Sequence, residues 1–182
     1  MSHIRSKDTR PELAVRRGLW RRGYRFRVNV RSLPGTPDIV LPKYRTAVFV
    51  NGCFWHGHHG CRSYTVPKTN TAFWKEKVER NRARDLLDAQ RLESIGWSTV
   101  TVWECELGKA QLEKTLDRIE SELKQNMSKW ERYRSRRRAD RQFAMEQARR
   151  RREIAALVEA ELAERLDTAI PESIKRMSKK EI

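Results

Sequence analysis

The sequence lacks any apolar run of the roughly 18 to 20 residues needed to span a bilayer, and no apolar signal region follows Met1. Cysteine is also scarce, with three residues in 182, and an odd number of cysteines argues against a disulfide framework. No internal repeat is visible. These absences predict an intracellular, cytoplasmic protein with no membrane association and no disulfides.

Acidic residues are few relative to basic ones. The 24 Asp and Glu residues face 40 Lys and Arg residues, which gives a formal net charge of +16. Such a surface favours a polyanionic partner, because neutralising phosphates releases counterions. An anionic membrane is the competing partner, but without an apolar span the composition favours nucleic acid. A hydrophobic content of 38% still permits one compact core.

Residues 1–125 carry the pattern of an α/β domain. Thr9 and Glu12 fit a capping box at the start of a helix, and the apolar run at 46–50 predicts a central strand. The predicted elements are a helix from Thr9 to Gly23, strands at 24–28, 38–41 and 46–50, a helix at 72–95, a strand at 97–103 and an amphipathic helix at 109–125.

Residues 126–182 differ in character and predict a basic helical extension that is partly disordered. Arginines cluster at 136–138 and 149–152, and an amphipathic apolar pattern follows from Ile154 to Leu166. Two interpretations remain open. The arginines could clamp DNA without sequence preference, or the apolar stripe could dock on the domain or on a partner helix.

The richest chemistry lies in one loop that follows the predicted central strand. Residues 53–61 contain two cysteines, three histidines and two aromatic residues, and the third cysteine, Cys105, ends another predicted strand. Three cysteines and one histidine form a tetrahedral set that suits structural zinc. The sequence predicts Cys53, Cys61 and Cys105 as ligands, and the spacing leaves open which histidine completes the set.

Three further groups are candidates for chemistry. Asp38 stands at a strand start, where a carboxylate can hold Mg²⁺ against a phosphate, although Asp in turns often makes only local hydrogen bonds. His56 can act as a general acid or base, or can itself be the zinc ligand. Three aromatic residues can stack on bases or simply pack on the sheet: Phe54, Trp55 and Trp74. The strand next to Asp38 offers Phe49-Val50-Asn51, with neither an acid nor a lysine, which excludes a standard PD-(D/E)xK nuclease. A variant of that site, in which a backbone carbonyl and a histidine replace the acid and the lysine, stays open.

Several ordered motifs, spread over residues 1 to about 108, resemble those of the very short patch repair (Vsr) mismatch endonucleases. The motifs are RSKDTRPE at 5–12, LPGTPDIV at 33–40, GCFWHGH at 52–58, PKTN at 67–70, Phe73-Trp74, Asn81 with Arg84 and Asp85, and VWECEL at 102–107. The resemblance implies a restriction-endonuclease-like α/β fold, a mixed sheet flanked by helices with a structural zinc. It further implies Mg²⁺-dependent nicking 5′ to the thymine of T:G mismatches in double-stranded DNA, the lesion left by 5-methylcytosine deamination.

The resemblance also assigns roles to single residues. Asp38 and the backbone carbonyl of Val50 would hold Mg²⁺, His56 would be the catalytic histidine, and Asp85 and Glu12 would be acids near the site. Zinc would bind Cys53, His58, Cys61 and Cys105, and DNA would contact Phe54, Trp55, Trp74, Lys68, Asn70, Arg5 and Lys7. A functional link to mismatch-repair proteins and to a cytosine-5 DNA methyltransferase follows, for a monomer associated with the nucleoid.

Some features depart from the family pattern. Val50 replaces a common threonine, and one extra residue precedes Cys61. Met1 falls inside the usual N-terminal segment, which leaves two alternatives open: part of an arm that contacts DNA is absent, or the start codon is misplaced. The extension from 126 has no counterpart. Two alternative functions therefore stay open: a restriction or phage-defence nuclease without mismatch selectivity, and a catalytically silent zinc module that binds DNA.

Overall fold

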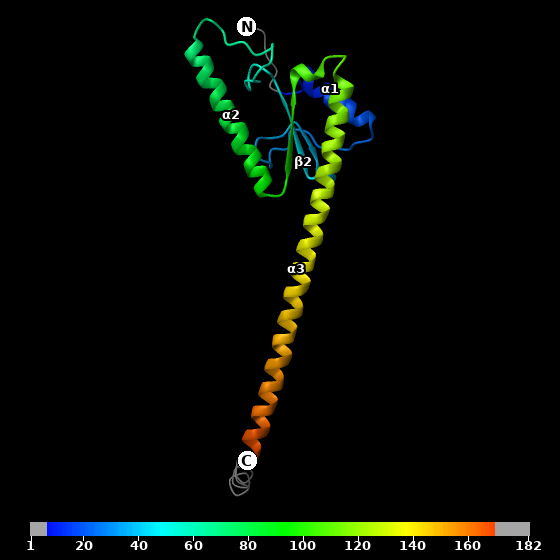
Figure 1. The fold of residues 1–182 in the computed structure, drawn as a ribbon, viewed down its shortest axis with the longest axis vertical. Coiled ribbons are helices and arrows are strands. Elements are labelled where there is room, and N and C mark those ends of the chain that lie inside the picture. Colours follow the sequence, from blue (N-terminus) through cyan, green and yellow to red (C-terminus); the bar gives the residue numbers. More distant parts are fainter. Residues whose placement is uncertain (1–6, 170–182) are drawn as a thin grey trace. The chain divides into compact units, whose positions relative to one another are not determined.

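The computed structural model describes residues 7–169, and their contacts divide the chain into two units, Met1–Arg132 and Tyr133–Ile182. Each unit is described by itself. No helix among residues 7–169 is long and apolar enough to cross a membrane. The elements, coloured along the chain in Figure 1, are α1 (Arg10–Arg21), β1 (Ile39–Leu41), the 3₁₀ turn η1 (Pro42–Tyr44), β2 (Thr46–Asn51), α2 (Thr71–Ser94), β3 (Ser98–Trp103), η2 (Glu104–Leu107) and α3 (Leu112–Ala169).

The sheet is small and mixed, with strand order β1-β2-β3. β1 pairs antiparallel with β2, with Ile39 opposite Val48, and β2 pairs parallel with β3, with Val48 opposite Val100. The predicted α/β architecture and the central place of β2 are therefore confirmed. The Thr9 capping box is also confirmed, because the Thr9 side chain accepts from the Glu12 backbone while the Glu12 carboxylate accepts from the Thr9 backbone.

The strand predicted at 24–28 is wrong. Only one isolated bridge forms there, in which Arg27 and Val40 exchange two backbone hydrogen bonds of 2.8 Å. Asn29 then adopts a φ of 49°, which takes the chain out of the extended conformation. Tyr24 is held by packing in the core instead of by a ladder.

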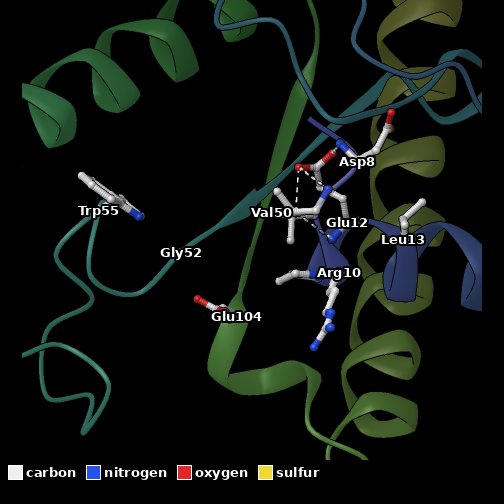
Figure 2. A pocket seen from close by; sticks show the side chains of 10 residues that line it. Asp8, Arg10, Glu12, Leu13, Val50, Gly52, Trp55 and Glu104 are labelled. Atoms are coloured by element: carbon white, nitrogen blue, oxygen red, sulfur yellow. Dashed lines mark hydrogen bonds between the residues drawn. The ribbon is translucent and has the colours of Figure 1, made fainter. Parts of the chain in front are cut away.

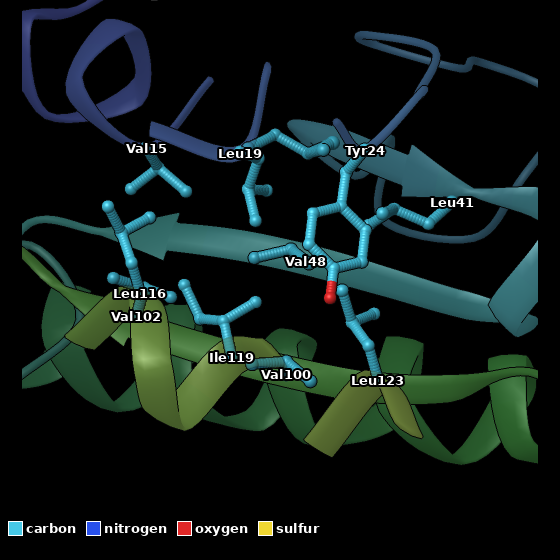
Figure 3. Close-up of a cluster of buried hydrophobic side chains, with 11 residues drawn as sticks. Val15, Leu19, Tyr24, Leu41, Val48, Val100, Val102, Leu116, Ile119 and Leu123 are labelled. Carbon is cyan, nitrogen blue, oxygen red and sulfur yellow. The ribbon is translucent and has the colours of Figure 1, made fainter. Parts of the chain in front are cut away.

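The main core lies between the sheet, α1 and the first turns of α3 (Figure 3). The sheet contributes alternate residues that point to one face, including Val48, Val100 and Val102. The helices add Val15, Leu19, Leu116, Ile119 and Leu123 at helical spacing, all fully buried. Gly18 lets α1 approach α3 closely, since a Cβ at this position would lie 2.4 Å from Leu116.

The other face of the sheet is turned toward α2, and Figure 1 shows β2 between α2 and α3. The alternation along β2 and β3 turns Phe49, Thr99 and Thr101 to this side, where they line a hollow together with residues of α2. Gly35, in the loop before β1, lies between Phe49 and Asp88 of α2. The candidate site therefore forms between the sheet and α2, away from the main core.

α3 continues without a break past the boundary predicted at residue 125. Asn126 donates a hydrogen bond of 3.2 Å to the Thr46 hydroxyl. The Arg45 guanidinium lies over the rings of both Trp97 and Trp130, 4.6 Å from each centroid. These contacts attach the helix to the sheet beyond residue 125, and the described contacts divide after Arg132. A functional boundary at 125 stays a prediction.

Candidate active site

Asp38 lies immediately before β1 with a partly buried carboxylate. Its Oδ2 atom accepts a hydrogen bond of 2.7 Å from the Val50 backbone N–H, which ties it to the adjacent strand. Burial raises the pKa of Asp38 to about 6, against the opposing effect of the Val50 N–H, and the nearby Glu12 carboxylate raises it further. A cation would favour the ionised form of this carboxylate, so the local chemistry fits a divalent metal ion with oxygen ligands.

Glu12 is buried on the first turn of α1, with Arg16 one turn later. The Nη2 atom of Arg16 donates to the Glu12 carboxylate at 2.8 Å and to the backbone carbonyl of Asp38 at 3.2 Å. Its Nη1 atom donates to Asp8. Arg16 therefore fixes Glu12 relative to Asp38. Sequence reasoning missed this residue, because an arginine on a basic helix gives no signal of burial.

His56 lies in the loop after β2 and pairs with Asp85 of α2, with Nδ1 of His56 2.5 Å from Oδ2 of Asp85. The same helix also donates hydrogen bonds to the loop backbone on both sides of His56. Asn81 donates to the Trp55 carbonyl at 2.7 Å, and Arg82 donates to the Gly57 carbonyl. Three neighbouring residues of α2 thus position the His56 ring: Asn81, Arg82 and Asp85.

These predicted residues meet in one hollow of about 490 Å³. Glu12, Asp38, His56 and Asp85 all line it, although they come from α1, the start of β1, a loop and α2. Asp88 and Arg84 of α2 line it as well and were not predicted to belong to the site. The spacing of Asp85 and Asp88 was the available signal, because residues three apart share a helix face.

Figure 2 shows a second hollow, of about 700 Å³. Glu12 and Val50 line both hollows. In Figure 2, Trp55 lies across the second hollow from Arg10 and Glu12 of α1. Its wall is built from residues 8–13 and from Val50, Gly52, Trp55 and Glu104.

The predicted DNA-contacting aromatic residues form one cluster. The ring centroids of Phe54 and Trp55 are 5.2 Å apart, and Trp74 lies 5.3 Å from Phe54 and 6.0 Å from Trp55. Phe73 joins them at 5.2 Å from Trp74 and is half exposed. All are T-shaped contacts, in which the edge of one ring packs on the face of another, and Phe54, Trp55 and Trp74 are half-buried.

The polar residues predicted to contact DNA lie on the surface, for those that the structure describes. Lys7, Lys68 and Asn70 are exposed, and Arg5 lies outside the described residues. Asn70 is the N-cap of α2, but its φ is 53° and its side chain makes no capping hydrogen bond. Its amide therefore stays available to a ligand.

Cys53, His58, Cys61 and Cys105 form a cluster whose potential ligand atoms all lie within 4.8 Å of one another. The Nδ1 atom of His58 is 3.6 Å from the Cys53 sulfur and 3.4 Å from the Cys105 sulfur. His58 therefore completes the set, while His59 is exposed and lines a neighbouring hollow. This Cys₃His group can bind a metal ion.

The three thiols of this group differ in the direction in which their pKa is shifted. Burial raises the pKa of Cys53 and raises that of Cys105 to about 12, whereas the Ser63 backbone N–H lowers the pKa of Cys61. Three sulfurs this close repel one another as thiolates unless a cation lies between them. The donor set thus fits a bound metal.

Comparisons with known proteins identify the family of the chain. Residues 1–62 match the family model of the DNA mismatch endonuclease Vsr. The type II nicking enzyme V.NmeAIP of Neisseria meningitidis serogroup A is 47% identical over 125 residues, covering 68% of this chain and 89% of the relative. The type II nicking enzyme V.XorIIP of Xanthomonas oryzae is 50% identical over 122 residues, 64% of this chain and 89% of the relative. The chain belongs to the Vsr family.

The DNA mismatch endonuclease Vsr of Escherichia coli K12 is 46% identical over 107 residues, 59% of this chain and 68% of that protein. As a Vsr family member the protein is a DNA endonuclease that hydrolyses phosphodiester bonds. DNA is its substrate, and the hollow around Asp38 and His56 is the candidate place for the chemistry.

Proposed function

We propose that this protein is a Mg²⁺-dependent, strand-specific endonuclease that nicks duplex DNA 5′ to the thymine of a T:G mismatch. The observation that carries this proposal is the meeting of Glu12, Asp38, His56 and Asp85 in one hollow, close in sequence to the aromatic cluster. The hollow supplies acids for a cation and a histidine for proton transfer, and the aromatic rings supply a surface that tests base stacking.

His56 would act as the general base. Its Nδ1 faces the Asp85 carboxylate, so the hydrogen bond between them places the proton on Nδ1 and leaves Nε2 free to accept one. Water attacking the phosphate would give its proton to Nε2, and the Asp85 carboxylate would stabilise the imidazolium that results. Asn81 and Arg82 would keep the ring in place through the loop backbone.

Asp38 and the backbone carbonyl of Val50 would hold Mg²⁺, with Glu12 as a neighbouring acid. When bound, Mg²⁺ supplies positive charge that stabilises the charge developing on the phosphate. Arg16 would keep the Glu12 carboxylate aligned toward this place, because it donates to that carboxylate and to the Asp38 backbone carbonyl. The Val50 side chain is not needed for this role, which is consistent with valine replacing threonine there.

Phe54, Trp55 and Trp74 would wedge into the duplex beside the mismatch. A T:G step is weaker than a sound pair, so unstacking it costs less than the roughly few kcal/mol of an intact step. Arg5, Lys7, Lys68 and Asn70 would contact the DNA around it. The wedge would therefore enter a T:G step more readily than a sound step, which makes the enzyme selective for the mismatch.

We further propose that the Cys₃His group holds structural zinc. A tetrahedral centre with Zn–S of about 2.3 Å and Zn–N of about 2.0 to 2.1 Å separates sulfur from nitrogen by about 3.5 Å. The two distances from His58 Nδ1, 3.4 and 3.6 Å, are close to this value. The zinc would pin the loop of His56 to the end of β3.

The cellular setting completes the proposal. Nicking at deaminated 5-methylcytosine links the enzyme functionally to mismatch-repair proteins and to a cytosine-5 DNA methyltransferase. The enzyme would act as a monomer at the cytoplasmic nucleoid. Its mixed sheet between helices is the expected layout of a restriction-endonuclease-like fold.

The test is a nicking assay with an end-labelled duplex that carries one T:G pair, in Mg²⁺, beside the same duplex fully paired. A single nick 5′ to the mismatched thymine, absent from the paired duplex and from reactions without Mg²⁺, supports the proposal. Equal cutting of both duplexes would assign the protein to nucleases without mismatch selectivity. Binding of DNA without any cutting would assign it to silent binding modules.

A further inference from the structure

The part of α3 beyond the catalytic unit is strongly basic. Residues 133–152 contain nine arginines against two acids, Asp140 and Glu146, which leaves a net charge of +7. Every one of these arginines is exposed, and the described residues from 133 onward contribute nothing to the buried core. Packing therefore does not explain why this segment is arginine-rich.

The arginines gather on one face of the helix. At 100° per residue, six of the nine fall within about 120° of the circumference, while both acids lie outside that sector. The remaining positions of the sector hold Met145 and Ala148, which bring no negative charge. We call this sector the arginine face; its members are Arg134, Arg137, Arg138, Arg141, Arg149 and Arg152.

The charges of the arginine face are largely uncompensated within the protein. Arg149 pairs with Glu153 at 2.8 Å on the surface, a weak exposed contact that a phosphate can displace. Within the described part of the chain, the other five make no ion pair. A guanidinium without a carboxylate partner is free to form bidentate hydrogen bonds to phosphate oxygens.

We propose that the arginine face is a second DNA-binding surface, which holds the phosphate backbone of undamaged duplex without reading sequence. From residue 134 to residue 152 the helix extends about 27 Å, along which a duplex presents about 16 phosphates. A helix of about 10 to 12 Å diameter also fits a major groove about 12 Å wide. The surface tethers the endonuclease to its polymer while the catalytic unit samples base pairs.

The chemistry of the opposite side of the helix argues for DNA over a lipid surface. A membrane-bound amphipathic helix needs an apolar face opposite its charges. Within residues 133–152 the opposite sector contains Arg136 and Arg150 beside Phe143, so this segment has no apolar face that could enter lipid. DNA, in contrast, is already the substrate of this family.

The experiment compares two charge-matched triple variants of the full chain. R134Q/R138Q/R141Q removes three charges from the arginine face, and R136Q/R150Q/R151Q removes three from outside it. Glutamine keeps a high helix propensity, and circular dichroism checks that helix content is unchanged. Fluorescence anisotropy with a fully paired duplex, without Mg²⁺, gives Kd between 50 and 200 mM salt.

The arginine-face variant is expected to bind at least about tenfold more weakly near 0.1 M salt, and its log K against log salt slope falls by about 3. The off-face variant should lose less than about threefold. The single-turnover nicking rate at saturating DNA should stay unchanged in both, because the catalytic hollow lies in the other unit.

Three outcomes would overturn the proposal. Equal losses in both variants would mean that overall charge matters and that no face is used. Unchanged binding in both would remove DNA as the partner of this helix. Unchanged DNA binding with lost binding to double-stranded RNA, or to vesicles with about a third phosphatidylserine, would assign the arginine face to that other partner. Because paired DNA is the probe, these results do not depend on T:G selectivity.

Discussion

The imidazole of His58 lies parallel to the indole of Trp103, with ring centroids 4.1 Å apart and an interplanar angle of 1°. Trp103 ends β3, two residues before Cys105. The stack thus fixes the His58 ring on the strand that delivers one cysteine of the metal group, and turns Nδ1 toward both Cys53 and Cys105. The last residue of β3 therefore orients the His58 ring.

The first prediction concerns this metal group. C105S should lose zinc and lower Tm by more than about 10 °C, because the apparent binding energy of structural zinc is on the order of 10 kcal/mol. Metal content by mass spectrometry and a melting curve measure both effects. H59A, at the exposed neighbour, should keep one zinc per chain and the parent Tm. Full zinc content in C105S would contradict the assignment.

The second prediction separates chemistry from binding at Asp38. D38A should slow nicking of a T:G duplex by at least about 10³-fold, since a metal ion contributes several kcal/mol to charge stabilisation. Affinity for the same duplex should change less than about threefold, because many other contacts hold the DNA. Asp140, exposed on α3, provides the control variant D140N. Loss of affinity together with nicking in D38A would assign Asp38 to binding or folding.

The third prediction concerns the partner of His56. D85N should lower kcat about 10²-fold with little change in KM, because an amide no longer selects the tautomer with Nε2 free. The kcat loss should be partly restored in D85E, which keeps the carboxylate. E93Q, on the exposed end of the same helix, should behave as the parent. A rise in KM at constant kcat would show that Asp85 serves substrate binding instead.

The fourth prediction concerns Arg16. Breaking a buried ion pair by removing one partner costs roughly 3 to 5 kcal/mol, so R16Q should lower the free energy of unfolding by about that amount. Arg16 is 8% exposed, whereas its neighbour Arg17 is on the surface, and R17Q should change stability by less than about 0.5 kcal/mol. Urea denaturation measures both. Equal small effects would mean that Arg16 does not hold Glu12 in place.

The fifth prediction is a pH dependence. Burial raises the pKa of Tyr24 to about 12, and its hydrogen bond to Glu120 adds to the rise. Because the folded-state pKa exceeds the unfolded value of about 10, the phenol stabilises the fold fully below pH 10 and loses that stability as pH rises toward 12.

The full effect is about 2 to 3 kcal/mol, at about 1.36 kcal/mol per pKa unit. Urea unfolding at pH 9, 10 and 11 should therefore show a steeper loss of stability for the parent than for Y24F, which cannot ionise at this position. Parallel pH profiles for the two proteins would show that the phenol contributes no such linkage.

Local signals explain which parts of the fold could be predicted from the sequence. Three features depend only on neighbours in the chain: the Thr9 capping box, the apolar run at 47–50 within β2, and the glycine that follows α2, Gly96 with a φ of 77°. Residues 24–28 alternate apolar and basic side chains, as a strand would, but they form no strand. A ladder also needs a partner edge of sufficient length. Here Arg27 finds only Val40.

The candidate site could be predicted only in part, for a similar reason. The cysteines stood out because they are rare, and Asp38 and His56 stood out because each lies beside a predicted strand, whereas the roles of Asp85 and Glu12 came from the resemblance. Arg16 and Asp88 were missed, because their burial depends on how α1 and α2 pack on the sheet. Long-range packing decides which of many charged residues leave the surface.

The hollow proposed as the catalytic site is lined by Glu12, Asp38, His56 and Asp85, which come from segments far apart in the chain. Such a site cannot form piecewise, because contacts between distant residues close only when the whole domain has folded. Newly made or locally unfolded chains would therefore keep their positive charge but would lack the assembled site that cuts DNA. If the hollow is the site of cleavage, nuclease activity is expected only from the folded domain, because small domains unfold cooperatively.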